Sequence, residues 1–267
     1  MLATLVAGPF CACDARSLVP DAGTGTGGGG GAGAGGTRVV IDSWPNDLLS
    51  NFEDLAGATI VRAGSPPRNG YWYAYADGSP TCIQSPDGRY VGEPPPVPPP
   101  QTSGGFAGSL SLHGLWSGCT TWGAGIGADI NTPVVPDGEV YLGPKVPYDL
   151  SLYSGITFFA MAAPGSDTRL RLKVLTRTTT RSEEGGACDE STIGAGKCGD
   201  HYGELFDLPG NGTWKKVTVT FSEAAFRQEG WGAWFPFVPR DVMGIQIQSV
   251  DLSETYDFWI DDMYLLP

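Results

Sequence analysis

The feature that most constrains the fold is a strict alternation of apolar and polar residues in short segments separated by turns. In residues 169–176, Leu170, Leu172 and Val174 alternate with charged side chains, and residues 215–221 repeat the pattern with valines. One apolar and one polar face is typical of half-buried strands in antiparallel sheets. The alternation therefore predicts antiparallel sheets rather than packed helices.

Ten segments carry a strand pattern and are bounded by turn residues. They are residues 59–61, 71–75, 108–115, 123–130, 155–162, 169–176, 204–208, 215–221, 243–250 and 258–265. Helical periodicity is nearly absent, and residues 222–226 form at most a turn. We predict an all-β protein, a two-sheet antiparallel β-sandwich of the jelly-roll type.

Composition limits the partners of such a sandwich. The chain has 16 basic against 29 acidic residues, a net charge of −13, which disfavours nucleic acid and anionic membrane surfaces. Its 40 glycines and 22 prolines indicate turn-rich β structure or linker sequence. We therefore expect no nucleic-acid partner, and membrane association only through an N-terminal lipid anchor.

The N-terminus has the composition of an export signal and a tether. Residues 1–13 are a short apolar run ending in small residues and cysteine, which predicts the remnant of a bacterial lipoprotein signal with Cys11 or Cys13 lipidated. The alternative is a mis-chosen start codon before a disordered leader. Residues 14–40 are glycine-rich and predict a flexible tether. The expected location is extracellular, at a bacterial cell surface.

Residues 41–267 are expected to form one domain. Within it, residues 79–105 have little strand character and contain a polyproline run at 94–100. Apolar patterning resumes on both sides of this stretch. We therefore predict a long proline-rich surface loop rather than a domain boundary.

Four further cysteines suggest two disulfides, Cys82 with Cys119 and Cys188 with Cys198. An even count in a chain expected to be exported favours this chemistry. Residues 189–197 then form a short loop with no other evident means of holding its shape. Zinc is the competing interpretation, but the chain has no CxxC motif and only two histidines, so ligand spacing for a structural site is missing.

Catalytic motifs are absent from the sequence. Nucleophile-elbow, zinc-protease and phosphate-loop patterns do not occur. Paired carboxylates could hydrolyse glycosides. However, adjacent acids such as Asp261 and Asp262 should point to opposite faces of a strand. We predict no catalytic residues and a protein that is not an enzyme.

Aromatic and amide side chains favour sugar recognition. In residues 71–75, three tyrosines share one face of the predicted strand and Trp72 takes the other. Aromatic rings can stack on the C–H faces of sugars. The alternative is that aromatic residues fill the core. The further aromatics considered for either role are Trp116, Trp122, Tyr202, Trp231, Trp234 and Phe237.

Two amides strengthen this interpretation. Gln246 and Gln248 lie on one face of the strand predicted at 243–250, where uncharged amides can bind hydroxyl groups. An ordinary solvated face would show the same pattern.

Acidic residues near both ends of the domain predict a cation site. Glu53 and Asp54 stand near its start, and Asp261 and Asp262 near its end. First and last strands of a sandwich are often neighbours, and Ca²⁺ takes six to eight oxygen ligands. We expect a structural Ca²⁺ there, with exposed acids at strand ends as the alternative.

Several segments resemble those of a known family. Residues 50–54 and 258–263 resemble the ends of galactose-binding-like jelly-roll modules. Residues 148–159, and 212–221 with 226–228, are similar to family 11 carbohydrate-binding modules. Further segments resemble bacterial surface lipoproteins carrying such a domain; they are residues 68–73, 122–127, 198–203 and 228–232.

The resemblance implies a jelly roll with a concave glycan-binding face and structural calcium at Glu53 and Asp261. Together with the aromatic and amide pattern, it predicts one set of ligand-binding residues. They are Trp122, Asp200, His201, Tyr202, Arg227, Trp231, Gln246 and Gln248. Several groove tyrosines of the family have no aromatic counterpart here, and the proline-rich insertion and both cysteine pairs are additions.

The function expected is therefore that of a non-catalytic extracellular module, part of a surface lipoprotein, that binds a polysaccharide or other glycan. The rival hypothesis is a structural or protein-interaction jelly roll without sugar binding. The mitochondrial complex I assembly-factor family, which has a similar scaffold, illustrates that use.

Overall fold

The computed structural model of the chain describes residues 47–53, 67–85, 110–132, 145–252 and 254–267. The predictions for the lipoprotein signal, the tether, the strand at 59–61, the polyproline run and Asp54 lie outside these residues. Within the described part of the chain, no helix is both long and apolar enough to cross a membrane.

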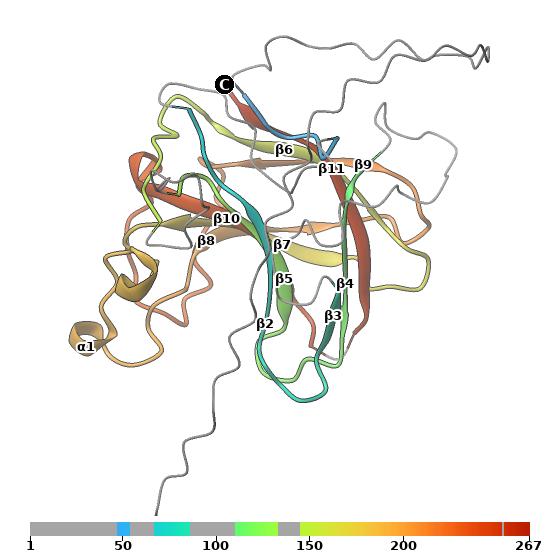
Figure 1. Cartoon of the computed structure of the whole chain (residues 1–267), viewed down its shortest axis with the longest axis horizontal. Helices are drawn as coiled ribbons and strands as arrows, with labels where there is room; N and C mark the ends of the chain where they lie inside the picture. Colours follow the sequence, from blue (N-terminus) through green and yellow to red (C-terminus); the bar gives the residue numbers. More distant parts are fainter. Residues whose placement is uncertain (1–46, 54–66, 86–109, 133–144, 253) are drawn as a thin grey trace, which may run out of the picture. The chain divides into compact units, whose positions relative to one another are not determined.

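The strands form two antiparallel sheets, labelled in Figure 1. One sheet has the order β3 (Ile83–Ser85), β4 (Leu112–Ser117), β11 (Tyr256–Leu266), β6 (Gly155–Ala162) and β9 (Lys215–Thr220), with β1 (Leu48–Ser50) also paired to β11. The other has the order β2 (Trp72–Ala76), β5 (Ala124–Asp129), β10 (Val242–Ser249), β7 (Arg169–Thr176) and β8 (Tyr202–Asp207).

Among the described strands, only β3–β4 and β7–β8 are consecutive in the chain and neighbours in one sheet. The other connections cross from sheet to sheet, as in a jelly roll. The predicted two-sheet antiparallel sandwich is confirmed.

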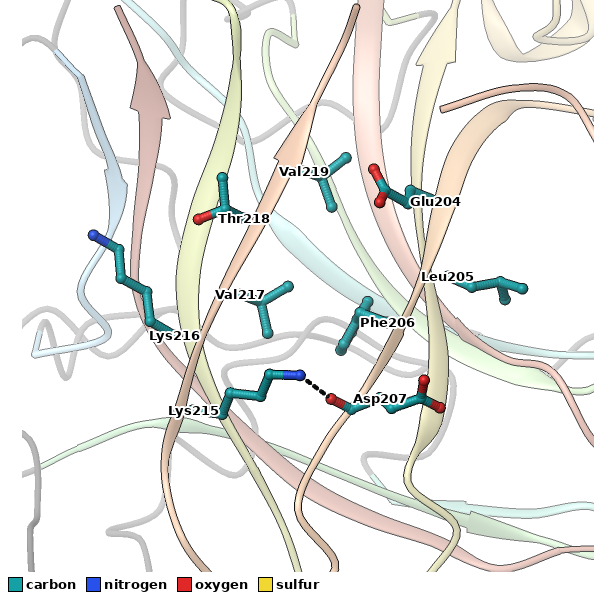
Figure 2. Close-up of a pocket in the computed structure, with 9 residues that line it drawn as sticks. All are labelled: Glu204, Leu205, Phe206, Asp207, Lys215, Lys216, Val217, Thr218 and Val219. Atoms are coloured by element: carbon teal, nitrogen blue, oxygen red, sulfur yellow. Dashed lines mark hydrogen bonds between the residues drawn. The ribbon is translucent and has the colours of Figure 1, made fainter. Parts of the chain in front are cut away.

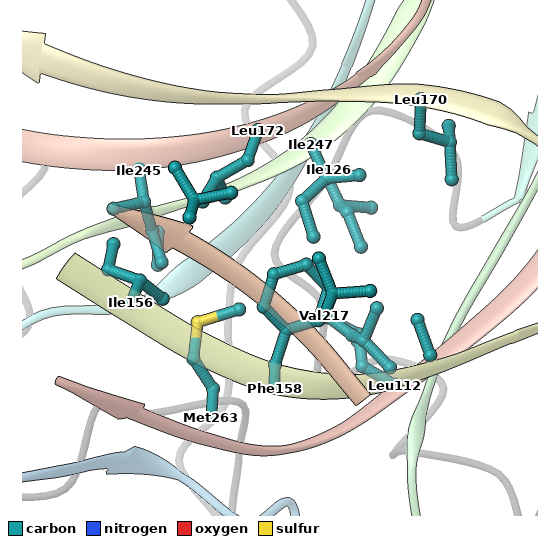
Figure 3. Packing of buried hydrophobic residues seen from close by; sticks show 14 of the residues in the cluster. Leu112, Ile126, Ile156, Phe158, Leu170, Leu172, Val217, Ile245, Ile247 and Met263 are labelled. Atoms are coloured by element: carbon teal, nitrogen blue, oxygen red, sulfur yellow. The ribbon is translucent and has the colours of Figure 1, made fainter. Parts of the chain in front are cut away.

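The core lies between the two sheets. Figure 3 shows Leu172, Ile245 and Ile247 of one sheet facing Ile156 and Phe158 of the other. All five side chains are essentially fully buried. Because every second residue of each strand points inward, the alternation in the sequence becomes one continuous apolar layer.

The polar face of β7 differs from the sequence expectation. Leu170, Leu172 and Val174 are buried as predicted, but Arg171 and Lys173 are only 8% and 7% exposed. The strand predicted to be half-buried is therefore buried on both faces, because the loop after β9 that carries Glu229 lies against these two side chains.

Two short elements escaped the sequence analysis. The segment predicted as a loop from residue 79 contains β3, which pairs with β4 at the sheet edge. The loop closed by Cys188 and Cys198 contains the helical turn α1 (Glu190–Ile193), capped by the Asp189 carboxylate on the Ser191 amide. That loop therefore has a second means of holding its shape. Both predicted disulfides are present, Cys82–Cys119 and Cys188–Cys198.

β11 contains an irregularity at its acidic residues. Its inward residues run Phe258, Ile260 and then Met263, so the spacing changes from two to three, and the register with β6 shifts between residues 261 and 264. This β-bulge places both Asp261 and Asp262 off the core-facing side. The expectation that these neighbours point to opposite faces was therefore wrong. The predicted adjacency of the first and last strands is confirmed by the pairing of β1 with β11.

Candidate functional site

The outer face of the five-stranded sheet carries two rows of side chains that run across the strands. The first row is Tyr75, Gly125, Gln248, Arg171 and Leu205, and the second is Tyr73, Gly127, Gln246, Lys173 and Gly203. Five strands about 4.8 Å apart give each row a length of about 19 Å. The sequence prediction that Gln246 and Gln248 share one face is confirmed.

The tyrosines lie over glycines of the neighbouring strand. A Cβ atom added at Gly127 would be 2.8 Å from Cζ of Tyr73, and one at Gly125 would be 2.6 Å from Cζ of Tyr75. No side chain fits beneath either ring, so glycine alternates along this face of β5. Burial raises the pKa of Tyr73 and Tyr75, so both remain neutral phenols that can donate hydrogen bonds.

The two amides are fixed by hydrogen bonds. Gln246 Nε2 donates to the Tyr73 hydroxyl at 3.1 Å. Gln248 Nε2 donates to the Trp122 carbonyl at 2.8 Å, and its Oε1 accepts from Lys173 Nζ at 2.7 Å. Each amide is thereby held in one orientation at the centre of the face.

Cationic side chains on this face lie beside acids, and two of them share one carboxylate. The Glu229 carboxylate lies 3.4 Å from Arg171 Nε and 3.3 Å from Lys173 Nζ, and Lys145 Nζ lies 3.0 Å from Asp129. Burial lowers the pKa of Lys173, and the negative charge of Glu229 opposes that shift. Because each of these cations has an acid beside it, the face offers polar groups without a strong net charge.

Trp122 borders one end of the first row. Its side chain is 44% exposed and stacks on Tyr75, with ring centroids 5.8 Å apart. Oδ2 of Asp77 accepts the backbone amides of Thr121, Trp122 and Gly123 at 2.7, 3.1 and 3.2 Å. Burial opposes the effect, but these and other hydrogen bonds lower the pKa of Asp77. The carboxylate therefore stays ionised and fixes the backbone that presents Trp122.

Trp231 lies in the loop between β9 and β10, which contacts the sheet at β7 through Glu229. Its side chain is 46% exposed. Asp200, only 2% exposed, accepts the amides of Glu229, Gly230 and Gly232 at 2.8, 2.8 and 3.1 Å. Asp200 was predicted to bind ligand, but its oxygens serve this loop instead.

The same loop is also tied to the Cys188–Cys198 segment. The Lys197 carbonyl accepts from the Ala233 amide at 2.9 Å, and Lys197 Nζ donates to the Trp231 carbonyl at 3.0 Å. Trp234, in the same loop, is 75% exposed. The loop thus presents two tryptophans from a backbone held at many points.

Two predicted ligand residues are used inside the protein. His201 is buried, and its Nδ1 lies 2.8 Å from Thr179 Oγ1; burial lowers its pKa to about 3, so the ring is neutral. Tyr202 packs its ring against Phe226 and Phe237, at centroid distances of 5.6 and 5.3 Å. His201 is therefore buried and hydrogen-bonded, and Tyr202 belongs to an aromatic cluster packed against the core.

Arg227 meets this face through its backbone. Its amide and carbonyl pair with Gly203, and its carbonyl also accepts a hydrogen bond from Arg171.

Of the eight predicted ligand residues, Trp122, Gln246 and Gln248 lie together on the face and Trp231 lies in the adjacent loop. Sequence reasoning did not assign Tyr73, Tyr75, Lys173 or Glu229 to the site. The alternation of tyrosines in residues 71–75 had indicated a platform of Tyr73 and Tyr75, and the alternating glycines of β5 were a further available signal for this tyrosine platform.

One cavity lies away from the outer face. It has a volume of about 390 Å³ and opens between the edge strands β8 and β9, where Phe206 of β8 and Val217 and Val219 of β9 line it (Figure 2). Glu204 also lines it, and burial raises the pKa of that carboxyl. Its apolar lining residues Phe206, Val217 and Val219 belong to the hydrophobic core. The cavity is therefore the space between the two sheets where their edge strands do not pair. The outer face is the better candidate, because it gathers the aromatic, amide and charged groups.

A second acidic region joins the ends of the domain. Asp261 is 2% exposed, and burial together with the charges of Asp262 and Glu53 raises its pKa to about 8. No ion pair between Asp261 and a lysine or arginine occurs among the described residues. Carboxylates are the hard oxygen ligands that Ca²⁺ prefers, but Glu53 Oε1 accepts the Leu110 amide at 2.9 Å, and the three acids do not bring one oxygen each within 4.8 Å of one another.

The zinc alternative concerns the cysteines. In the described part of the chain, the one set of three candidate ligand atoms within 4.8 Å of one another is Asp77 with Cys82 and Cys119. The two sulfurs are bonded to each other, so they are not thiolate ligands. The zinc alternative therefore has no support there.

No family model and no curated protein sequence matches this chain. Among solved structures, the family 11 carbohydrate-binding module from Clostridium thermocellum in complex with a β-1,3-1,4-mixed-linked tetrasaccharide has 13% identity and a TM-score of 0.42, over 82% of this chain and 94% of its own. An exo-β-agarase has 12% identity and a TM-score of 0.44, over 83% and 25%. A β-1,2-glucanase from Parabacteroides distasonis has 10% identity and a TM-score of 0.41, over 84% and 26%. These similar structures include the family that the sequence motifs resemble.

Proposed function

We propose that this protein binds a neutral glycan on the outer face of its five-stranded sheet, without catalysis. The observation that carries the proposal is the half-exposed Trp122, stacked on Tyr75 and hydrogen-bonded through its backbone to Gln248. An indole face held beside oriented amides and hydroxyls suits a sugar ring, which has apolar C–H faces and hydroxyl groups.

The charge arrangement supports a neutral ligand. Lys173 and Arg171 already have Glu229 as a partner, and Lys145 has Asp129. An anionic ligand would have to displace these carboxylates. A hydroxyl-rich ligand can instead add hydrogen bonds to groups whose charges are already balanced.

The proposal leaves catalysis out because the acids on this face are engaged in ion pairs. A glycosidase needs one carboxylic acid and one free carboxylate on either side of the scissile bond. Glu229 and Asp129 are each bound to cationic side chains. Glycan binding without cleavage is therefore the expected activity.

We place the protein outside the cytoplasm because its two disulfides persist best in an oxidising compartment. Anchoring at a cell surface through Cys11 or Cys13 remains part of the proposal. Mass spectrometry of the membrane fraction would find a diacylglyceryl-modified peptide; an unmodified soluble N-terminus would contradict it.

We also propose that Ca²⁺ binds at Asp261, Asp262 and Glu53. The support is the buried Asp261 carboxylate, whose pKa is raised by burial and by the negative charges of Asp262 and Glu53. A bound divalent cation would compensate these charges at the junction of β1 and β11.

Affinity electrophoresis and a glycan array test the binding proposal. Trp122→Ala should weaken binding about tenfold or more, because it removes the stacking surface. Leu152→Ala is the control, since Leu152 is a highly exposed apolar side chain in the turn before β6. No retention of the native protein on any polysaccharide, or equal loss in both variants, would overturn the proposal.

The rival function, protein interaction, has its own signature in the same experiment. It would be favoured if a protein partner bound the native protein and Trp122→Ala equally in a fixed ratio, and if no glycan on the array bound the native protein. Release of reducing ends from a retained polysaccharide would instead show an enzyme.

A further inference from the structure

The two loops that present Trp122 and Trp231 are built in the same way. In each, one aspartate accepts three backbone amides: Asp77 from residues 121–123, and Asp200 from residues 229, 230 and 232. Each loop also lies beside a disulfide. Cys119 precedes Trp122 by three residues, and Cys198 precedes Asp200 by two.

The two loops are connected across the sheet face by a chain of polar contacts. The Trp122 carbonyl accepts from Gln248, whose Oε1 accepts from Lys173 Nζ at 2.7 Å. Lys173 Nζ lies 3.3 Å from the Glu229 carboxylate, and the Glu229 amide donates to Asp200. The face therefore begins at one aspartate-held loop and ends at the other.

An exposed tryptophan on a mobile loop would lose conformational freedom when it bound a ligand. A loop already held in one conformation avoids most of that cost. Three amide hydrogen bonds to one ionised carboxylate are strong restraints, since charge-assisted hydrogen bonds exceed neutral ones. The Cys188–Cys198 segment adds the contacts of Lys197 with Ala233 and Trp231.

We propose that Asp77 and Asp200 are positioning residues that hold Trp122 and Trp231 as the two end contacts of one binding face, with the disulfides as their supports. The proposal rests on the glycan-binding function proposed above. It requires that Asp77 affect binding through Trp122 alone and that Asp200 affect binding through Trp231 alone.

A double-mutant cycle on glycan affinity tests this pairing. Asp77→Asn should weaken binding about tenfold in the native background and have little further effect in Trp122→Ala. Asp200→Asn should behave in the same way with Trp231→Ala. The crossed pairs, Asp77→Asn with Trp231→Ala and Asp200→Asn with Trp122→Ala, should be additive. Equal coupling in matched and crossed pairs would overturn the positioning roles.

A second measurement needs no glycan. The protein is labelled with 5-fluorotryptophan, and the resonances of residues 122 and 231 are assigned by Trp→Phe variants. Asp77→Asn should shift or broaden the ¹⁹F signal of Trp122 and leave that of Trp231 unchanged, and Asp200→Asn should do the reverse. Changes in both signals, or in neither, would overturn the proposal even if the variants still bind.

The outcomes separate the two proposals. If the native protein binds no glycan, the proposed function fails and the ¹⁹F spectra alone decide the positioning roles. If it binds but the cycles show no matched coupling, the function stands and the positioning proposal fails. Reduction of the disulfides supplies a further check: reduced protein that keeps its sandwich, as judged by circular dichroism, should bind several-fold more weakly.

Discussion

At the residue scale, burial changes the protonation state of single side chains. His201 is the clearest case. Its ring is buried, and burial, aided by the positive charges of Lys173, Lys145 and Arg181, lowers its pKa to about 3. The resemblance to family 11 modules implied a ligand contact for His201, but its neutral ring, hydrogen-bonded to Thr179, serves the fold.

This burial makes stability depend on pH. Because the folded pKa lies below the unfolded value of about 6.5, His201 contributes stability above pH 6.5 that is lost as the pH falls toward 3. The loss approaches about 1.4 kcal/mol per pH unit. Urea unfolding at pH 7.5, 5.5 and 4.5 should show His201→Asn losing less stability on acidification than the native protein. His113→Asn, at the half-buried His113, is the control. Parallel pH profiles for native protein and His201→Asn would contradict the assignment.

Strands and loops show how far pattern reasoning extends. β6 and β7 were predicted at their observed bounds because each is eight residues long with an inward apolar residue at alternate positions. β1 and β3 were missed because three residues cannot show a period. The bulge in β11 was missed for another reason: it depends on how β11 pairs with β1 and β6, which are distant in the chain and whose registers with β11 shift there.

At the element scale, β5 supplies a sharp prediction. Gly127→Ala would place a methyl group 2.8 Å from the Tyr73 ring, so the tyrosine must leave its position. We expect several-fold weaker glycan binding and a loss of about 1–3 kcal/mol in the free energy of unfolding. Gly210→Ala is the control, because the nearest atom there is a Thr168 side-chain methyl. Isothermal titration calorimetry and chemical unfolding measure the two effects; an unchanged affinity would exclude the tyrosine platform from the site.

The whole molecule is closed by the pairing of its first and last described strands. β1 pairs with β11 beside Asp261, so the acidic region lies where the two ends of the domain meet. A cation there would link segments about 200 residues apart and thereby oppose separation of the two ends.

Thermal unfolding tests this link. Adding Ca²⁺ to chelator-treated protein should raise Tm by several degrees, since a ligand that binds only the folded state stabilises it. Asp261→Asn should abolish the response, whereas Asp257→Asn, on the same strand, should keep it. A Tm that is identical in Ca²⁺ and in chelator would contradict the site.

The sequence by itself determined the architecture and part of the site. Alternation specifies which face of each strand is buried, and that is enough for a sandwich and for placing Gln246 and Gln248 together. The even number of cysteines and their grouping along the chain predicted both disulfides. These properties are local, or depend only on composition, so one chain reveals them.

Only the tertiary structure decided which polar groups gather on the candidate face and which are used within the fold. Asp200, His201 and Tyr202 have the residue types of a binding site, yet their partners are loop amides, Thr179 and a phenylalanine cluster. Conversely, Lys173 belongs to the site because Glu229, 56 positions later, reaches it. Hydrogen bonds between distant segments form only when the sheets assemble, so no local pattern records them.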